Sequence, residues 1–170
     1  MEGNYWGDYI GVDSGHDGIG DSWYEVDSGN IDHYPLMGMF HSFTTSLGSD
    51  LTVISNSTVE GFEYIESNST IKISVSNKTA SQKFGFCRAC ISHALMNPNE
   101  ISVIIDDGQT PVLYHNYALY DNETYRWIYF AYEHSTHEIV IVSEFSSVFI
   151  LLCLIVATLL IVIVYRRKSN

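Results

Sequence analysis

The residues best suited to bind a metal ion are three aspartates near the N-terminus. Asp13, Asp17 and Asp21 lie in the segment DSGHDGIGD, whose glycines allow a tight turn. Counted from Asp13 they stand at positions 1, 5 and 9, and carboxylates in such a loop suit a hard cation such as Ca²⁺. Position 3, which supplies another ligand in a calcium loop, is Gly15. The segment therefore predicts either a calcium site or an acidic turn closed by hydrogen bonds to the aspartates.

The cysteines do not form a zinc or redox motif. Cys87 and Cys90 have the C-x-x-C spacing, but a zinc ribbon needs a second pair, and Cys153 lies in an apolar stretch. Alternate residues of a strand face opposite sides, so Cys87 would face the core and Cys90 the outside. We expect Cys87 to be a buried structural residue, with a disulfide or a bound metal as the alternatives.

One group of residues raises the question of copper binding. Met37, Met39 and His41 would lie on one face of a strand, and thioethers and imidazoles are copper ligands. A strand edge with ordinary packing explains the same pattern better. We therefore expect no copper site here.

Composition and motifs argue against two classes of function. The net charge is −12, nine acidic residues occur among the first 50, and no Lys or Arg precedes Lys72. Such a chain lacks the cations that neutralise phosphates in nucleic-acid binding. It also has no G-x-S-x-G nucleophile signature and no glycine-rich phosphate loop. The sequence therefore predicts a protein that is not an enzyme and does not bind nucleic acid.

Four N-x-S/T triplets predict glycosylation. They begin at Asn56, Asn68, Asn77 and Asn122. A single triplet often occurs by chance, but four close together favour a sugar-coated surface outside the cell.

The C-terminal part of the chain predicts a membrane anchor. Residues 145–165, FSSVFILLCLIVATLLIVIVY, carry no charge and precede the basic tail 166–170. As a helix this stretch would be about 30 Å long, which matches the hydrocarbon core of a bilayer. Positive residues stay on the cytoplasmic side, so we expect an extracellular N-terminus and a cytoplasmic C-terminus. A buried core helix is the alternative, but the run is long and uniformly apolar for one.

The start of the chain lacks the basic and apolar regions of a signal peptide. Translocation must then depend on the C-terminal helix, or the chain is the C-terminal piece of a longer precursor. We prefer the second interpretation.

Two parts of different composition precede the predicted anchor. Residues 1–42 are rich in Gly, Asp, Tyr and Trp, whereas residues 45–142 contain short runs of alternating apolar and polar residues. About seven strands at roughly ten-residue spacing predict an antiparallel, Ig-like β-sandwich. Asp107-Gly108 predicts a hairpin turn. Alternation predicts the following inward-facing residues: Ile71, Ile73, Val75, Cys87, Ala89, Ile91, Val103, Ile105, Trp127, Tyr129, Ile139 and Ile141.

Residues 3–37 resemble the end of archaeal surface proteins with a right-handed β-helix of the NosD-like, pectate-lyase-like class. The resemblance lies in a GNYW-DY series, a DGIGD series and a D-x-YPLM series: Gly3, Asn4, Tyr5, Trp6, Asp8, Tyr9; Asp17, Gly18, Ile19, Gly20, Asp21; and Asp32, Tyr34, Pro35, Leu36, Met37. It implies that residues 1–42 are a β-helix C-terminal segment, with the body of the β-helix upstream.

Residues 85–96, GFCRACISHALM, and residues 129–142, YFAYEHSTHEIVIV, also resemble a small β-sandwich found at the C-termini of archaeal surface proteins. The final segment resembles the anchor of those proteins. Together the resemblances imply a glycosylated, non-catalytic protein of the cell membrane that tethers or displays an extracellular β-helix. Its partners would be the lipid bilayer and cell-surface polysaccharide or S-layer proteins. The alternative is a carbohydrate-binding or polysaccharide-processing protein whose active body lies upstream.

Aromatic residues of the first segment allow two interpretations. Tyr5, Trp6, Tyr9, Trp23 and Tyr24 could stack on sugars, or they could cap the last coil of a β-helix. We favour capping.

Overall fold

The chain consists mainly of antiparallel β-strands, as predicted. The structure is a computed structural model, and it describes residues 3–97, 101–143 and 158. Its elements within these residues are β1 (Tyr24–Asp27), β2 (Asn30–Asp32), β3 (Met39–Thr44), β4 (Asp50–Ser55), β5 (Thr58–Ile65), η1 (Glu66–Asn68), β6 (Thr70–Ser76), β7 (Phe84–Ser92), β8 (Ile101–Ile105), η2 (Asp106–Gly108), β9 (Val112–Asp121), β10 (Tyr125–Glu133) and β11 (His137–Ser143).

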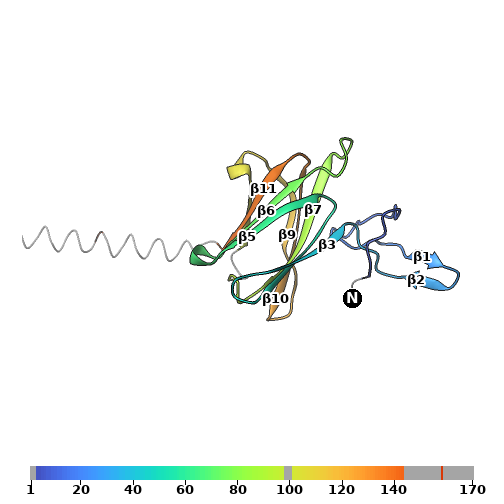
Figure 1. Cartoon of the computed structure of the whole chain (residues 1–170), viewed down its shortest axis with the longest axis horizontal. Helices are drawn as coiled ribbons and strands as arrows, with labels where there is room; N and C mark the ends of the chain where they lie inside the picture. The colour runs from blue at the N-terminus through green and yellow to red at the C-terminus, as the bar shows by residue number, and fades with distance from the viewer. Residues whose placement is uncertain (1–2, 98–100, 144–157, 159–170) are drawn as a thin grey trace, which may run out of the picture.

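Two sheets pack face to face to form a sandwich (Figure 1). The five-stranded sheet has the order β3-β4-β7-β10-β9, and the four-stranded sheet has the order β5-β6-β11-β8. Side chains from both sheets fill the space between them, because alternate residues of each strand point inward. The largest fully buried side chains include Tyr132, Phe130, Leu51, Ile71, Ile73 and Ile139.

Ten of the twelve predicted inward residues face this core, and the prediction for β10 is wrong by one residue. Ile128, Phe130 and Tyr132 point between the sheets. Tyr129 is buried in a separate cluster on the outer face, and Trp127 is only partly buried. The pairing of β10 with β7 is regular from Tyr125 to Glu133, so a prediction shifted by one residue places the whole strand on the opposite face.

The cause of this error is a second covered surface. Leu36 of the N-terminal segment packs on Ile54, Phe86 and Tyr129 of the five-stranded sheet. As a result, β10 is buried on both faces over part of its length, and its apolar residues do not alternate with polar ones. A continuous apolar run does not reveal which side of the strand meets the main core.

The predicted hairpin at Asp107-Gly108 does not occur. Asp106, Asp107 and Gly108 all have positive φ, at 49°, 53° and 85°. This turn leads from β8 in the four-stranded sheet to β9 in the five-stranded sheet. The turn residues were therefore identified correctly, but the two flanking strands do not pair with each other along their length.

The connectivity also differs from the immunoglobulin pattern. An immunoglobulin constant domain places strands ABED in one sheet and CFG in the other. Here β9 and β10 of the five-stranded sheet come between β8 and β11 of the four-stranded sheet, whereas strands D and E of the immunoglobulin sheet follow each other directly in the sequence. The described strands thus form an antiparallel sandwich with a different strand order.

The N-terminal segment, residues 3–38, is a compact appendage on the sandwich. It contains the β1–β2 hairpin, which projects from the molecule in Figure 1. Leu36 bridges Tyr5 in parallel and Ile19 in antiparallel fashion. The described residues include no β-helix coil. The five-stranded sheet begins at Met39, inside the region that composition assigned to the first segment.

The N-terminal segment joins the sandwich at one end, and the last strand, β11, finishes at the other. At the N-terminal end lie the connections 56–57, 77–83 and 134–136, beside Met39, where the N-terminal segment joins. At the opposite end, here called the exit end, lie the turns 45–49, 66–69 and 122–124 and the last residue of β11, Ser143. Residues 3–38 and Ser143 are thus at opposite ends.

The predicted membrane span, residues 145–165, lies outside the described residues except for Thr158. Among the described residues, the structure contains no helix with the length and apolar character needed to cross a membrane.

Candidate functional site

The predicted calcium loop forms a turn in which the aspartates accept hydrogen bonds from the backbone. Asp13 accepts from the N–H groups of Asp17 (3.0 Å) and Gly18 (2.9 Å). Asp17 accepts from Ile19 at 2.9 Å, and Asp21 accepts from Ser14 at 2.9 Å. These bonds are those of the acidic turn that the sequence offered as the alternative to a calcium site.

The sheet beneath holds this loop in place. Gly18, with φ at 77°, lies close to Phe86 and the aliphatic part of Arg88, where a Cβ would be 3.3 Å from that of Arg88. The His16 ring lies 4.4 Å from Tyr114 and 5.9 Å from Tyr129. The loop therefore covers the outer face of β7, β9 and β10.

The three carboxyl groups differ in environment. Burial raises the pKa of Asp13 above its ordinary value, against hydrogen bonds from Asp17 and Gly18 that lower it. The hydrogen bond from Ser14 lowers the pKa of Asp21, which is fully exposed. Asp13 and Asp17 are thus the partly buried members of the set, and Asp21 is the exposed one.

Two of the three carboxylates lie around the position of Gly15. A Cβ placed at Gly15 would be 4.0 Å from Asp13 Oδ1 and 4.0 Å from Asp17 Oδ2. Within the described residues, no three His, Cys, Asp or Glu side chains are grouped so as to hold a metal ion. The geometry thus brings Asp13 and Asp17 together and leaves calcium binding as a prediction.

The prediction for Cys87 is confirmed. Cys87 is a fully buried free cysteine, and Cys90 is half-buried. The Cys87 thiol lies 3.6 Å from Ser55 Oγ and 3.7 Å from Tyr132 Oη. Burial raises its pKa to about 11, so it is protonated and unreactive at neutral pH.

The methionine and histidine group divides between two surroundings. Met39 and His41 line a cavity of about 400 Å³ between the edges of the two sheets, together with Lys78 and Tyr5. Met37 instead packs against the cluster around Leu36. The three side chains therefore do not share one face, and ordinary packing accounts for them.

Two aromatic residues of the N-terminal segment stack on each other. The Trp6 and Tyr24 rings stack at 4.9 Å, and Tyr9 meets Tyr24 edge-on at 6.1 Å. Tyr5 lies apart from them and accepts a hydrogen bond of 2.7 Å from Lys78 Nζ. Trp23 remains 55% exposed. Most of these rings are therefore occupied by contacts within the molecule.

The four predicted glycosylation sites differ in accessibility. Asn68, Asn77 and Asn122 are exposed and lie in turns between strands. Asn56 is half-buried, and its side chain pairs with the backbone of β7. Its Nδ2 donates to the Phe84 carbonyl at 3.1 Å, and its Oδ1 accepts from the Phe86 N–H at 2.9 Å.

The chain matches no family model, no curated protein and no solved structure.

We expect calcium binding to be weak and to depend on Asp17. Titration of the chain truncated after Ser143 should give a dissociation constant of roughly 10⁻⁴–10⁻³ M, as in extracellular modules. Asp17→Ala should abolish the heat, because it removes one of the two converging carboxylates. Gly15→Asp should strengthen binding, because it restores the ligand at the third position. If calcium gives no heat with either the original chain or Gly15→Asp, the segment is an acidic turn only.

The structure predicts that Asn56 contributes to stability and that Asn77 does not. Asn56→Ala removes two hydrogen bonds to β7 and should lower the free energy of unfolding by about 1–3 kcal/mol. Asn77→Ala lies in an exposed connection and should change it by less than about 0.5 kcal/mol. Urea denaturation of both variants measures the difference. Equal effects would show that the Asn56 amide does not pair with β7.

Proposed function

We propose that this chain is a non-catalytic, glycosylated protein of the cell surface that tethers an extracellular β-helix region to the membrane. One observation carries the proposal. The N-terminal segment joins one end of the sandwich, and Ser143 lies at the other. The sandwich therefore has the geometry of a spacer between an upstream region and a C-terminal anchor.

The anchor in this proposal is the apolar segment 145–165 with its basic tail 166–170. β11 ends only two residues before this segment. A charge-free stretch of this length followed by three basic residues is typical of a single transmembrane helix with a cytoplasmic C-terminus.

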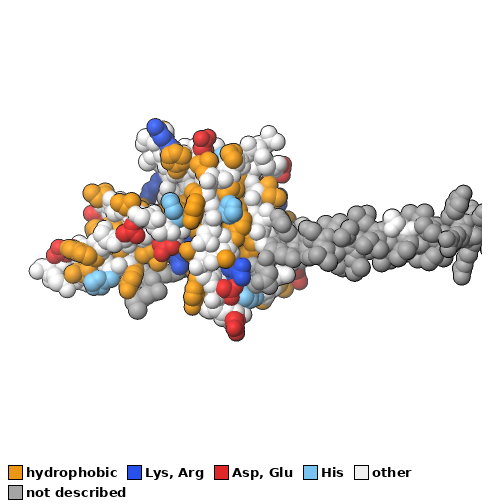
Figure 2. All heavy atoms as spheres, turned by 180° about the vertical axis from the view of Figure 1, so that it is seen from behind, with side chains coloured by type: hydrophobic (Ala, Val, Ile, Leu, Met, Phe, Trp, Pro, Cys, Tyr) orange, Lys and Arg blue, Asp and Glu red, His pale blue; other side chains and the backbone are white. Residues whose placement is uncertain are grey.

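The upstream attachment is supported by the surface of the N-terminal segment. Its exposed apolar residues include Ile10, 95% exposed, as well as Val12, Trp23 and Ile31. Figure 2 shows hydrophobic side chains at the surface of this projecting part. An adjoining β-helix coil would bury such residues, and the parallel bridge between Tyr5 and Leu36 is the kind of pairing that stacked coils use. The resemblance of this segment to NosD-like β-helix ends points the same way.

Protease protection tests the topology. Protease added to intact cells should remove an epitope placed at the N-terminus and spare one placed after Lys168, because the positive tail remains in the cytoplasm. Permeabilised cells serve as the control, since both epitopes should then disappear. Protection of the N-terminal epitope with loss of the C-terminal one would refute the proposed orientation.

A further inference from the structure

The outer face of the five-stranded sheet carries aromatic residues that the N-terminal segment does not cover. Tyr125, Trp127 and Tyr129 follow one another on this face of β10. Tyr129 is buried beneath the N-terminal segment. Tyr120 pairs with Trp127 across to β9. Towards the exit end, this leaves an uncovered group that consists of Tyr120, Tyr125 and Trp127.

These three rings form one cluster with free polar groups. The centroid of the Trp127 ring lies 5.1 Å from that of Tyr120 and 6.2 Å from that of Tyr125. Tyr120 is 59% exposed and Tyr125 is 36% exposed. No hydrogen bond joins their hydroxyl groups or the Trp127 indole N–H to another described residue. Rings with an apolar body and an available polar group are the residues found where a bilayer meets water.

The position of the cluster brings it close to the proposed membrane. Only residue 144 separates Ser143, at the end of β11, from the start of the predicted span. Two residue steps reach at most about 7 Å. The headgroup layer on each side of the hydrocarbon core is about 5–7 Å thick. If the anchor is inserted, the exit end must therefore lie within or next to the headgroup layer.

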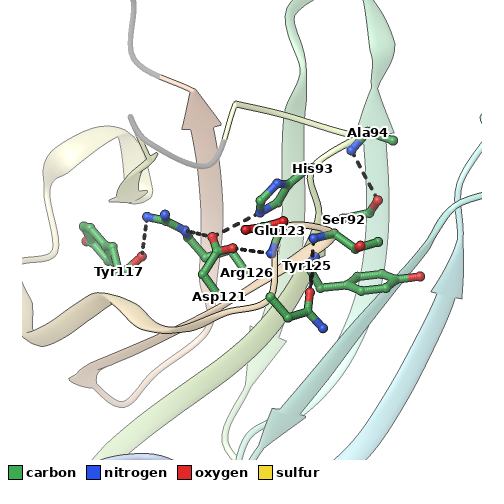
Figure 3. Close-up of polar contacts among 10 residues, drawn as sticks. Ser92, His93, Ala94, Tyr117, Asp121, Glu123, Tyr125 and Arg126 are labelled. Atoms are coloured by element: carbon green, nitrogen blue, oxygen red, sulfur yellow. Dashed lines mark hydrogen bonds and ion pairs between the residues drawn. The ribbon is translucent and has the colours of Figure 1, made fainter.

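The charged groups His93, Asp121 and Arg126 at the same end are paired with one another, which limits the cost of bringing them to a headgroup layer. Arg126 Nε donates to Asp121 Oδ2 at 2.8 Å, and His93 Nε2 lies 3.1 Å from the same oxygen (Figure 3). The Glu123 N–H donates to Asp121 Oδ1 at 2.8 Å. Among the described residues at this end, Asp50, Glu66 and Glu123 add negative charge, so a zwitterionic lipid fits better than an anionic one.

We propose that the exit end rests on the bilayer surface, with Tyr120, Tyr125 and Trp127 among zwitterionic lipid headgroups. This inference depends on the proposed membrane anchor. It adds that the sandwich is held against the membrane in one orientation, with the N-terminal segment pointing away from it.

Tryptophan quenching in vesicles tests the contact. The chain has three tryptophans, so Trp6→Phe combined with Trp23→Phe leaves Trp127 alone, and Trp6→Phe combined with Trp127→Phe leaves Trp23 alone. Both full-length variants are reconstituted into phosphatidylcholine vesicles, with or without bromine near the headgroup end of one acyl chain. We expect brominated lipid to reduce the fluorescence of Trp127 and to leave that of the exposed Trp23 unchanged.

Vesicle flotation separates this inference from the proposed anchor. A chain that does not float with the vesicles after an alkaline wash has no anchor, and the proposed function fails. A chain that floats while Trp127 is not quenched is anchored but does not rest on the bilayer, and the inference fails alone. Equal quenching of Trp127 and Trp23 would also overturn it, because the molecule would then have no preferred end at the membrane.

Discussion

Phe130→Ala should lower the free energy of unfolding by about 3–5 kcal/mol. The Phe130 side chain is fully buried between the two sheets, at the centre of β10. Its removal loses the free energy of transferring the ring from water and leaves a cavity in the core between the sheets. Urea denaturation of the chain truncated after Ser143 measures this loss.

Phe84→Ala is the matched control, because the same substitution is made at the first residue of β7, where the ring is 58% exposed. It should change the free energy of unfolding by less than about 0.5 kcal/mol. If the two variants were equally stable, Phe130 would not face the core, and the register of β10 would be the one that alternation predicts from the sequence.

Asp106→Asn should lower the free energy of unfolding by about 1.5–3 kcal/mol at neutral pH, the range for hydrogen bonds to a charged group. The Asp106 carboxylate accepts three hydrogen bonds: from Thr110 Oγ1 at 2.7 Å, from His137 Nδ1 at 2.6 Å and from the Glu138 N–H at 3.0 Å. It thereby fastens the turn between the sheets to the first residues of β11. An asparagine keeps the shape but cannot accept all three bonds.

Asp107→Asn is the control for the backbone of this turn. Both positions have positive φ, which asparagine tolerates as well as aspartate does. Asp107 is exposed, and its side chain forms no hydrogen bond with another described residue. Its substitution should leave stability nearly unchanged. A loss equal to that of Asp106→Asn would mean that the turn geometry, rather than the carboxylate, is responsible.

The effect of Asp106 should depend on pH. Burial alone would raise the pKa of Asp106, but the hydrogen bonds from Thr110, His137 and Glu138 bring it below the ordinary value of 3.8. A lowered pKa means that the folded state favours the ionised carboxylate. Its contribution is therefore present above pH 3.8 and is lost as the pH falls through the lower pKa of the folded state. The difference in stability between the original chain and Asp106→Asn should shrink accordingly below that pH.

Several strands could be predicted closely because their residues alternate and only one of their faces is covered. The segments TIKISVS and ISVII coincide with β6 and β8. Their side chains Ile71, Ile73 and Val103 reach the core as alternation requires. β10 could not be assigned in this way, because the cover over its outer face comes from residues far away in the sequence.

The candidate site was predictable only as a choice between two outcomes. The residue types in DSGHDGIGD specify a tight acidic turn, and the hydrogen bonds of Asp13, Asp17 and Asp21 follow from short side chains next to free N–H groups. Whether such a turn also binds a cation depends on carboxylate convergence at the ångström scale. The spacing of the aspartates along the sequence does not specify the distances between their carboxylates.

The positions of the last two strands affect how the protein can be made. β10 lies between β7 and β9 in the five-stranded sheet, and β11 lies between β6 and β8 in the other. Until they emerge from the ribosome, β9 and β8 have no neighbour to pair with in their own sheets. β10 also pairs with β7, and β11 with β6, which lie far back in the sequence, and contacts between distant segments form slowly. The sandwich can therefore close only when synthesis has reached Ser143, immediately before the proposed anchor, so a chain interrupted earlier would expose unpaired strands to aggregation.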